Sequence, residues 1–402
     1  MDYVDQLKSY PDLIQIIRGI YTLSNSSGSL FVSLGTYLLN KIRTEDRLTF
    51  YQELLSAVSF RHDFQLLSKV SNEELVSWET HTREQADNKE FKISQAKNAG
   101  LRDSYRVHIL DLANFYYNTG DMASTMKTLQ RAKEISITAD QQFDLFSLMA
   151  LTSLFKKNIS FAQNNAQKII LLAGITDKQT VTARVIMGLC NLENSNYKQA
   201  TEYFLGLNGE NNKELASNSD LAVYIVLGCL ASMDRKEIKS DVVQSKSFLV
   251  FSEDEPKLVE LLDSFLSCKF SRVVQILEDI KSQYVQDYFI GKSVHSIGEE
   301  IKNRCMIQFL KAFRRIKISD LAINFEMTEK TVEEKIAKLI IDGKVDARID
   351  AHQKIVRARE IDQKHKMHKS ILNTAADFIK TANLILLKTS IIQEDILVRP
   401  LR

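Results

Sequence analysis

The middle of the chain repeats one pattern, in which an apolar helix, a short polar turn and a second apolar helix follow one another. The pattern occurs five times, and its turns are about 35 to 38 residues apart. A single helical hairpin cannot cover its own apolar face, so successive hairpins have to stack. The sequence therefore predicts a mainly α protein with a helical-repeat solenoid over residues 101–285. The turns lie near Gly120, Asn158, Asn196, Asp234 and Lys269.

The first repeat, LANFYYNTGDMASTMKTLQRAKE, is similar to a tetratricopeptide unit. Its matching residues, ahead of the second helix, are Leu112, Ala113, Tyr116, Gly120 and Asp121. The other four repeats keep only the pattern of helix and turn. We expect the aromatic side chains within these helices to lie mainly in the core, namely Tyr117, Phe146, Phe204 and Phe265.

Proline is scarce, with three residues in 402. Because proline breaks helix interiors, this scarcity is typical of a chain built mostly from helices. Apolar residues at helical spacing indicate an N-terminal helical region over residues 1–100. From Glu79 to Arg106 charges of both signs alternate, which predicts one long exposed helix leading into the repeats.

Charge and hydropathy narrow the class of partner. The chain has 53 basic and 51 acidic residues, so it shows no overall electrostatic footprint for nucleic acid. The longest apolar run, Leu221 to Ala231, is about half a membrane span. The first residues, MDYVDQLKSYPDL, carry acids where a secretory signal carries basic residues. We expect a soluble intracellular protein that does not associate with membranes.

The four cysteines lack the spacing of a zinc site or a disulfide framework. They follow one another at intervals close to the repeat length. We therefore expect buried, unreactive thiols in equivalent small positions of the repeats. These residues are Cys190, Cys229, Cys268 and Cys305.

Residues 286–361 predict a winged helix. The segment IKNRCMIQFLKAF is amphipathic and supplies the first helix. Ser319 and Asp320 can cap a second helix, and Thr328 can cap a third helix that ends at Gly343. Two strands follow, VDARID and KIVRARE, so the order is three helices and a hairpin.

The hairpin predicts a protein interface. A winged helix has a short sheet, so its outer strand leaves backbone groups unpaired. Another chain can add a strand there, with its backbone supplying affinity. The residues that we assign to this edge are Val345, Ala347, Ile349, Val356 and Ala358.

A DNA-reading winged helix inserts its third helix into the major groove and offers basic and amide side chains there. Here the stretch from Thr328 to Lys344 has four lysines against four acids and contains no Arg, Asn or Gln. Specific nucleic-acid binding is therefore not expected. Basic residues gather elsewhere, where they could contact nucleic acid but more often form a solvated face or one for an acidic partner; they are Arg314, Arg315, Lys317, Arg357 and Arg359.

The last part of the chain, residues 362–402, predicts a long helix from Met367 to Ile392 and a short tail. Apolar residues recur every seven positions, and small residues lie four positions after the first three of them. Such a narrow seam packs in helical bundles. The helix either folds back on its own domain or joins partner helices, and its seam residues are Ile371, Phe378, Ile385 and Ile392.

No set of residues indicates catalysis, a metal or a cofactor. A zinc isopeptidase needs a His-x-His pair and a further acid, and the seven histidines provide no such pair. His365 and His368 lie a turn apart on the polar side of a helix start, where we expect them to be solvated. The sequence thus favours a protein that is not an enzyme.

Helical repeats, a winged helix and a C-terminal helix together resemble the PCI family, named for the proteasome lid, the COP-9 signalosome and translation initiation factor three. The stretches that carry the resemblance are DLANFYYNTGDMASTMKTLQRAKE, QSKSFLVFSEDEPKLVELLDSFLSCKF, IKNRCMIQFL and above all ARIDAHQKIVRAREIDQ. In the last stretch the matching residues are Ala347, Arg348, Asp350, His352, Lys354, Ile355, Ala358, Arg359 and Asp362.

Within the family, this wing looks most like that of signalosome subunits. The resemblance implies a scaffold that assembles with other signalosome subunits through winged helices and a shared bundle of C-terminal helices. It implies support for cullin deneddylation, contact with cullin-RING ligase components, and residence in nucleus and cytoplasm. A homologous subunit of the proteasome lid and a nucleic-acid-associated PCI protein are the alternatives.

Overall fold

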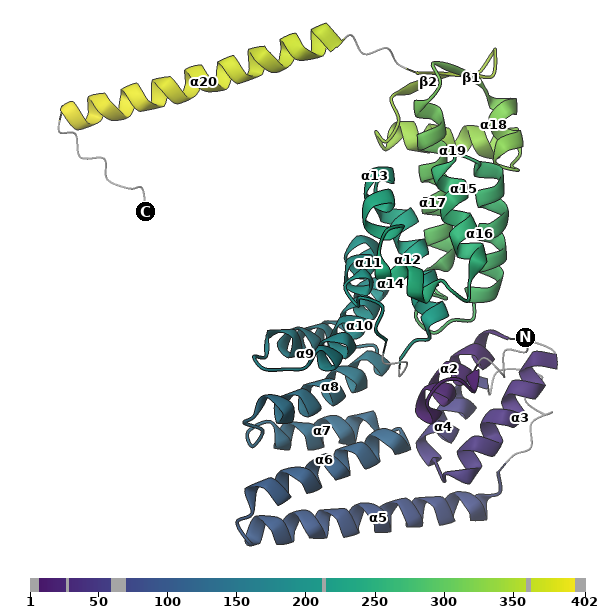
Figure 1. The fold of residues 1–402 in the computed structure, drawn as a ribbon, viewed down its shortest axis with the longest axis vertical. Coiled ribbons are helices and arrows are strands. Elements are labelled where there is room, and N and C mark those ends of the chain that lie inside the picture. The colour runs from purple at the N-terminus through teal and green to yellow at the C-terminus, as the bar shows by residue number, and fades with distance from the viewer. Residues whose placement is uncertain (1–6, 27–28, 59–69, 212–214, 359–362, 395–402) are drawn as a thin grey trace. The chain divides into compact units, whose positions relative to one another are not determined.

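The computed structural model describes residues 7–26, 29–58, 70–211, 215–358 and 363–394, most of which are helical (Figure 1). The chain divides into two compact units, Met1–Met306 and Ile307–Arg402. The division falls inside helix α17 (Val294–Lys311). The expected fold class is confirmed, since a helical-repeat region is followed by a small sheet near the C-terminus and by one more long helix.

The first unit begins with three helices that pack on one another, α2 (Asp12–Asn25), α3 (Ser29–Thr44) and α4 (Leu48–Val58). Helix α5 (Asn72–Asn98) follows and is mostly exposed along its length. Its start is fixed because Ser71 and Glu74 cap each other's backbone N–H groups.

The prediction of one helix from Glu79 to Arg106 is wrong at its C-terminal end. Helix α5 stops at Asn98, and Gly100 adopts a left-handed conformation with φ of 70°. Helix α6 then starts at Arg102. Charge alternation located the exposed helix, but the glycine ended it because a left-handed residue cannot continue an α-helix.

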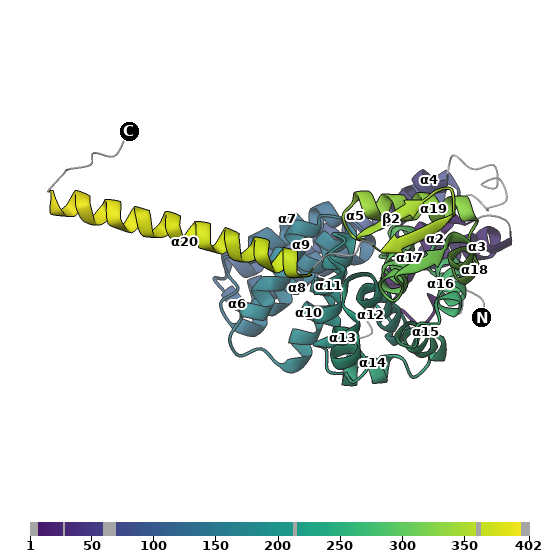
Figure 2. The same cartoon turned by 90° about the horizontal axis from the view of Figure 1, so that it is seen from above.

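The five helix–turn–helix pairs predicted from the repeat are all present, and Figure 2 shows them following an arc. Neighbouring helices of the series pack on one another from α5 through α12. The elements of the series are α6 (Arg102–Thr119), α7 (Met122–Ala132), α8 (Ala139–Phe155), α9 (Ile159–Leu171), α10 (Asp177–Glu193), α11 (Tyr197–Leu205), α12 (Asn218–Ser232), α13 (Arg235–Glu237) with the π-helix η2 (Ile238–Val242), α14 (Lys246–Phe251), α15 (Pro256–Leu266) and α16 (Phe270–Tyr284).

Four of the five turns share one conformation. A residue with positive φ ends the first helix, and the next residue is the N-cap of the second; the positive-φ residues are Gly120, Lys157, Ser195 and Cys268. At Gly120 the glycine is also required by space, because a Cβ there would lie 2.8 Å from the ring of Phe50. The first repeat is thereby held close to α4.

The core of the repeats centres on α12, whose residues from Asp220 to Ala231 are all buried. Phe204 and Phe265 are buried as expected, whereas Tyr117 and Phe146 are half-buried. The expectation of equivalent buried cysteines holds for three of them and is wrong for Cys268. That residue is exposed because it occupies the turn between α15 and α16, where its φ is 60°.

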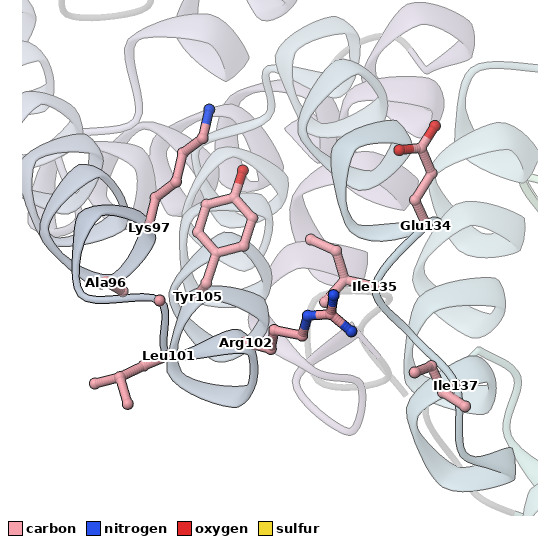
Figure 3. A pocket seen from close by; sticks show the side chains of 9 residues that line it. Ala96, Lys97, Leu101, Arg102, Tyr105, Glu134, Ile135 and Ile137 are labelled. Carbon is pink, nitrogen blue, oxygen red and sulfur yellow. The ribbon is translucent and has the colours of Figure 1, made fainter.

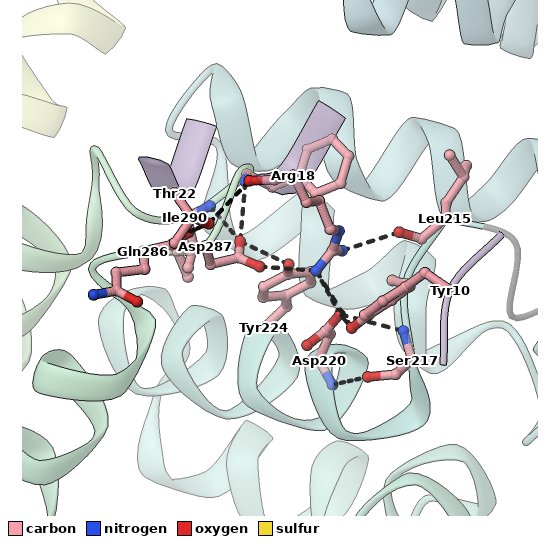
Figure 4. Close-up of polar contacts among 12 residues, drawn as sticks. Tyr10, Arg18, Thr22, Leu215, Ser217, Asp220, Tyr224, Gln286, Asp287 and Ile290 are labelled. Carbon is pink, nitrogen blue, oxygen red and sulfur yellow. Dashed lines mark hydrogen bonds and ion pairs between the residues drawn. The ribbon is translucent and has the colours of Figure 1, made fainter. Parts of the chain in front are cut away.

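A buried arginine joins α2 to distant parts of the first unit (Figure 4). One guanidinium nitrogen of Arg18, Nη1, lies 3.0 Å from Oδ2 of Asp220 and 3.2 Å from Oδ2 of Asp287. The other, Nη2, donates to the carbonyl oxygen of Leu215 at 3.0 Å. The Tyr224 hydroxyl donates to Oδ1 of Asp287 at 2.9 Å. All five residues lie in the interior.

Burial and ion pairing shift the pKa values of this cluster in opposite directions. Burial raises the pKa of Asp287, while Arg18 and the hydrogen bonds from Tyr224 and the Ile290 N–H oppose that rise. Burial alone would lower the pKa of Arg18, but Asp220 and Asp287 raise it well above its usual value. No local sequence pattern indicates this cluster, because its members are up to 269 residues apart.

The second unit contains a three-stranded antiparallel sheet in the order β1-β3-β2. The elements after α17 are β1 (Arg315–Lys317), α18 (Ile318–Asn324), α19 (Glu329–Ile341), β2 (Ala347–Asp350), β3 (Ile355–Ala358) and α20 (Gln363–Gln393). Thr328 caps α19 as predicted, accepting from the Thr331 N–H, and Gly343 has φ of 69°.

Two details of the predicted winged helix are wrong. The sheet is not a simple hairpin, because β1 pairs with β3 and makes β3 the middle strand. Helix α18 starts at Ile318 with Lys317 as N-cap, so Ser319 and Asp320 lie inside it rather than capping it. Arg359 and Asp362 of the family-like stretch lie outside the described residues, as does His62, one of the seven histidines. The division of the chain into four parts stays a prediction.

Removing the buried arginine should unfold the first unit more easily. In Arg18→Met the two carboxylates lose their cation in the interior, and we expect about 3–5 kcal/mol less free energy of unfolding. Urea denaturation followed by circular dichroism measures the loss. The matched control is Arg272→Met, whose partner Glu260 lies 2.7 Å away with both side chains about half exposed; it should cost less than about 1 kcal/mol. If both variants lost the same free energy of unfolding, the buried arginine would not be a special determinant of stability.

Thiol labelling should distinguish Cys268 from the other cysteines. Burial raises the pKa of Cys190, Cys229 and Cys305 to about 12. The thiolate is the reactive form, so these three should react very slowly with a disulfide reagent at about pH 8. We expect one of the four thiols to react in the native protein and all four in denaturant. Rapid labelling of any buried cysteine, located by peptide mapping, would contradict this packing.

Candidate protein-interaction surfaces

Among the described residues, β2 is an edge strand that pairs with β3 alone, so the other side of β2 is an open edge of the sheet. The N–H of Ala358 donates to the Arg314 carbonyl and that of Ile318 donates to the Lys354 carbonyl, so these positions of β3 and its turn face β1. Because backbone groups alternate in direction along an antiparallel strand, Arg357 and Ile355 face β2.

The same alternation fixes the direction of the β2 backbone. Arg348 pairs with Arg357 and Asp350 pairs with Ile355, so these two residues of β2 direct their backbone groups to β3. The backbone groups of Ala347 and Ile349 therefore face the open edge. That edge offers the donors and acceptors that an added strand requires.

The side chains of the five residues predicted for this edge differ in how deeply they are buried. Ala347 and Val356 are buried, Val345 and Ile349 are half-buried, and Ala358 is exposed. The apolar side chains of β2 thus hold the sheet on the helices, while the backbone provides the open edge. Val356 and Ala358 belong to the middle strand and do not lie at an edge.

A hollow of about 390 Å³ lies beside the start of β2, within the second unit. Phe313 is exposed in its wall, and Val345 and Ala347 line it as well. An apolar side chain from a chain added at β2 could enter this hollow. Its lining residues are Leu310, Lys311, Ala312, Phe313, Arg314, Ile316, Gly343, Lys344, Val345, Asp346, Ala347, Val356 and Ala358.

Helix α20 presents the predicted seam to solvent. Phe378 is 73% exposed and Ile385 is 60% exposed, and Ile371 and Ile392 are exposed to similar extents. No residue of α20 whose burial is described is buried. A large apolar surface on a protein marks an interaction site.

A second apolar stripe on α20 was missed in the sequence. Leu372, Ile379 and Leu386 also recur every seven residues, one position after the seam, and all three are exposed. Successive residues of a helix are about 100° apart, so the two stripes widen the apolar face. Leu384 and Leu387 are exposed too, which makes Leu384–Leu387 apolar nearly all round. In folded proteins a helix segment that is apolar nearly all round is usually buried.

A further hollow of about 390 Å³ lies in the first unit, between the α5–α6 turn and the α7–α8 turn (Figure 3). Lys97 and Tyr105 stand on one side, with Glu134 and Ile137 on the other. Leu101 and Ile137 are exposed. The hollow combines two cations, Lys97 and Arg102, with the single acid Glu134, and this set defines no catalytic arrangement.

The described part of the chain has no cluster of metal-binding side chains and no membrane-spanning helix. No group of three or more His, Cys, Asp or Glu side chains there is arranged to hold a metal ion. Among those same residues, no helix has the length and apolarity to span a bilayer.

Two family models match parts of this chain. A family model described as 26S proteasome subunit RPN7 matches residues 73–241, and one described as PCI domain matches residues 277–360. The second match covers the winged helix with its open edge. Residues 277–360 therefore form a PCI domain.

Over most of its length the chain is similar to subunit 1 of the COP9 signalosome. It is 26% identical over 316 residues to subunit 1b of Drosophila melanogaster, covering 76% of this chain and 60% of the relative. It is 25% identical over 334 residues to subunit 1 of Emericella nidulans, covering 79% and 67%. The 26S proteasome non-ATPase regulatory subunit 6 of Dictyostelium discoideum is 20% identical over 375 residues, covering 92% and 94%.

A proline at the open edge tests the backbone assignment. In Ala347→Pro the strand loses an outward N–H but keeps its bonds to β3, so we expect about tenfold weaker pull-down of PCI-domain partner chains. Circular dichroism should be unchanged. The control is Arg348→Pro, which removes an inward donor and should lower the stability of the winged helix. Unchanged partner binding by folded Ala347→Pro would exclude strand addition at β2.

Proposed function

We propose that this protein is a non-catalytic scaffold subunit of the COP9 signalosome and is the equivalent of subunit 1. The single observation that carries the proposal is α20, a helix of 31 residues with two exposed apolar stripes. A large exposed apolar surface of this kind marks a protein interaction site. The open edge of β2 offers a second contact for a neighbouring subunit.

In this role the deneddylating chemistry belongs to another subunit. The winged helix binds neighbouring PCI subunits, and the seam of α20 joins a bundle of C-terminal helices. The chain supports cullin deneddylation indirectly and so regulates cullin-RING ligases, with residence in nucleus and cytoplasm. Contact with the ligase components themselves is part of the same proposal.

The surface of α19 supports a protein-binding role over DNA reading. Helix α19 begins with Glu329, which pairs with Lys354 at 2.5 Å, and it also carries Glu333 and Glu334. Acids along a recognition helix would face phosphates and repel them.

One alternative is a subunit of the proteasome lid. It is favoured by the proteasome subunit of Dictyostelium, because the similarity covers nearly the full length of both chains. The two assignments differ in the chains that co-purify. Affinity purification of the tagged protein, followed by mass spectrometry, should recover signalosome subunits. Recovery of proteasome lid subunits instead would replace the proposal with the alternative.

Charge placed in the seam should remove the protein from its complex. Phe378→Asp with Ile385→Asp should leave the chain folded, because both side chains are exposed in it. In an assembled bundle each aspartate would be buried without a partner. A loss of about 2.7 kcal/mol is already a hundredfold in the association constant.

Gel filtration of cell extract measures the outcome. The double variant should elute as a free subunit. The control Lys380→Asp changes an exposed lysine that belongs to neither of the two stripes and should elute with the complex. Co-elution of the double variant with the complex would exclude α20 as an assembly element.

A further inference from the structure

Three arginines, one from each strand, form a row across the sheet of the second unit. Arg315 of β1 is in register with Arg357 of β3, and Arg357 is in register with Arg348 of β2. The neighbouring row on the other face, Ile316, Val356 and Ile349, packs toward the core. The arginine row is therefore on the outer face of the sheet.

This row is electrostatically unfavourable in the isolated chain. Arg315 and Arg357 form a non-hydrogen-bonded pair, in which Cα atoms approach to about 4.5 Å. Like charges directly opposite one another destabilise a sheet. Lys317 lies on the same face, in register with Ile355. The face thus carries four cations.

Asp350 is the one carboxylate of the strands on this face. It binds Arg357, with Nη2 to Oδ2 at 3.1 Å, and Gln353 accepts from the same nitrogen at 2.7 Å. The central arginine is therefore held in place. Arg315, Lys317 and Arg348 are exposed or nearly so and form no ion pair within the described part of the chain.

The row ends at the open edge. Arg348 is on β2, and its neighbours Ala347 and Ile349 direct their backbone groups outward. In a strand added antiparallel to β2, the residue opposite Arg348 would form a non-hydrogen-bonded pair with it, and side chains approach most closely in such pairs. An acidic side chain at that position would continue the row and neutralise its end.

We propose that this outer face recognises an acidic segment of a partner protein that adds to β2 as an extended strand. The inference rests on the proposed function, because it names the chemistry of the subunit segment that occupies the open edge. The guanidinium group of arginine can form two parallel hydrogen bonds with one carboxylate. Arg315 and Lys317 would bind further acidic side chains along the same segment. The arginine row is the determinant of partner specificity at this edge.

The observations favour protein over nucleic acid. A protein strand can use the unpaired backbone of β2 and the arginines together, whereas nucleic acid can use only the arginines. Helix α19, on the same winged helix, carries as many acids as lysines from Thr328 to Lys344.

The test uses the purified full-length chain and a fluorescent peptide of alternating threonine and glutamate. When extended, this peptide places its glutamates on one face. Fluorescence anisotropy should show binding that weakens with added salt. A threonine–glutamine peptide should bind at least about tenfold more weakly.

Charge reversal on the row should abolish the preference. Arg315→Glu with Arg348→Glu converts four cations against one carboxylate into two against three, and we expect about tenfold or greater loss of affinity. The matched control is Lys330→Glu with Lys338→Glu, which makes the same change in net charge on exposed positions of α19. Circular dichroism checks that both variants are folded, and Arg348→Gln alone provides a milder variant.

Three outcomes would overturn the inference. The first is no binding of the glutamate peptide by the native chain, and the second is equal loss in the two charge-reversed variants. The third is selective binding of single-stranded oligothymidine, lost on reversal of Arg315 and Arg348, which would assign the face to nucleic acid. None of these measurements depends on assembly, so a failure here leaves the gel-filtration test of the scaffold role unaffected.

Discussion

The first unit depends on one buried cation that is shared by two carboxylates. Arg18 comes from α2, whereas Asp220 lies in the first turn of α12 and Asp287 follows α16. Buried ion pairs add little net stability, because desolvation cancels much of the attraction. Their geometric demand is strict, since any arrangement that separates the partners leaves a charge buried alone. The cluster therefore determines how α2 packs on the repeats, and it adds little to the free energy of that packing.

Tyr288, the residue after Asp287, reinforces the same junction. Its ring lies edge-on to Tyr21 of α2, with centroids 5.5 Å apart, and contacts Phe155 of α8. The ammonium group of Lys157 lies 4.0 Å from the ring centroid, at a distance suited to a cation–π interaction. The short segment after α16 thus binds the N-terminal helices and the repeats through both charge and aromatic contacts.

The second unit has the opposite character, since its own contacts leave much of it unsatisfied. Its sheet has an open edge, its outer face has uncompensated arginines, and α20 exposes apolar stripes. Each of these features is costly for a protein that stays alone in water. The first unit surrounds its buried arginine with two carboxylates, while the second exposes charged and apolar side chains to solvent.

By itself the sequence determined the features that depend on near neighbours. Helix spacing, the turns near Gly120 and Asn158, the cap at Thr328 and the end at Gly343 could all be predicted, because caps and left-handed residues act within a few positions. The seam through Phe378 could be predicted because it is a property of one helix. The tertiary structure alone decided the pairing of Arg18, the exposure of Cys268 and the strand at Arg315–Lys317. It also decided that Arg315, Arg357 and Arg348 meet, because strand register sets which distant residues become neighbours, and no local pattern records that register.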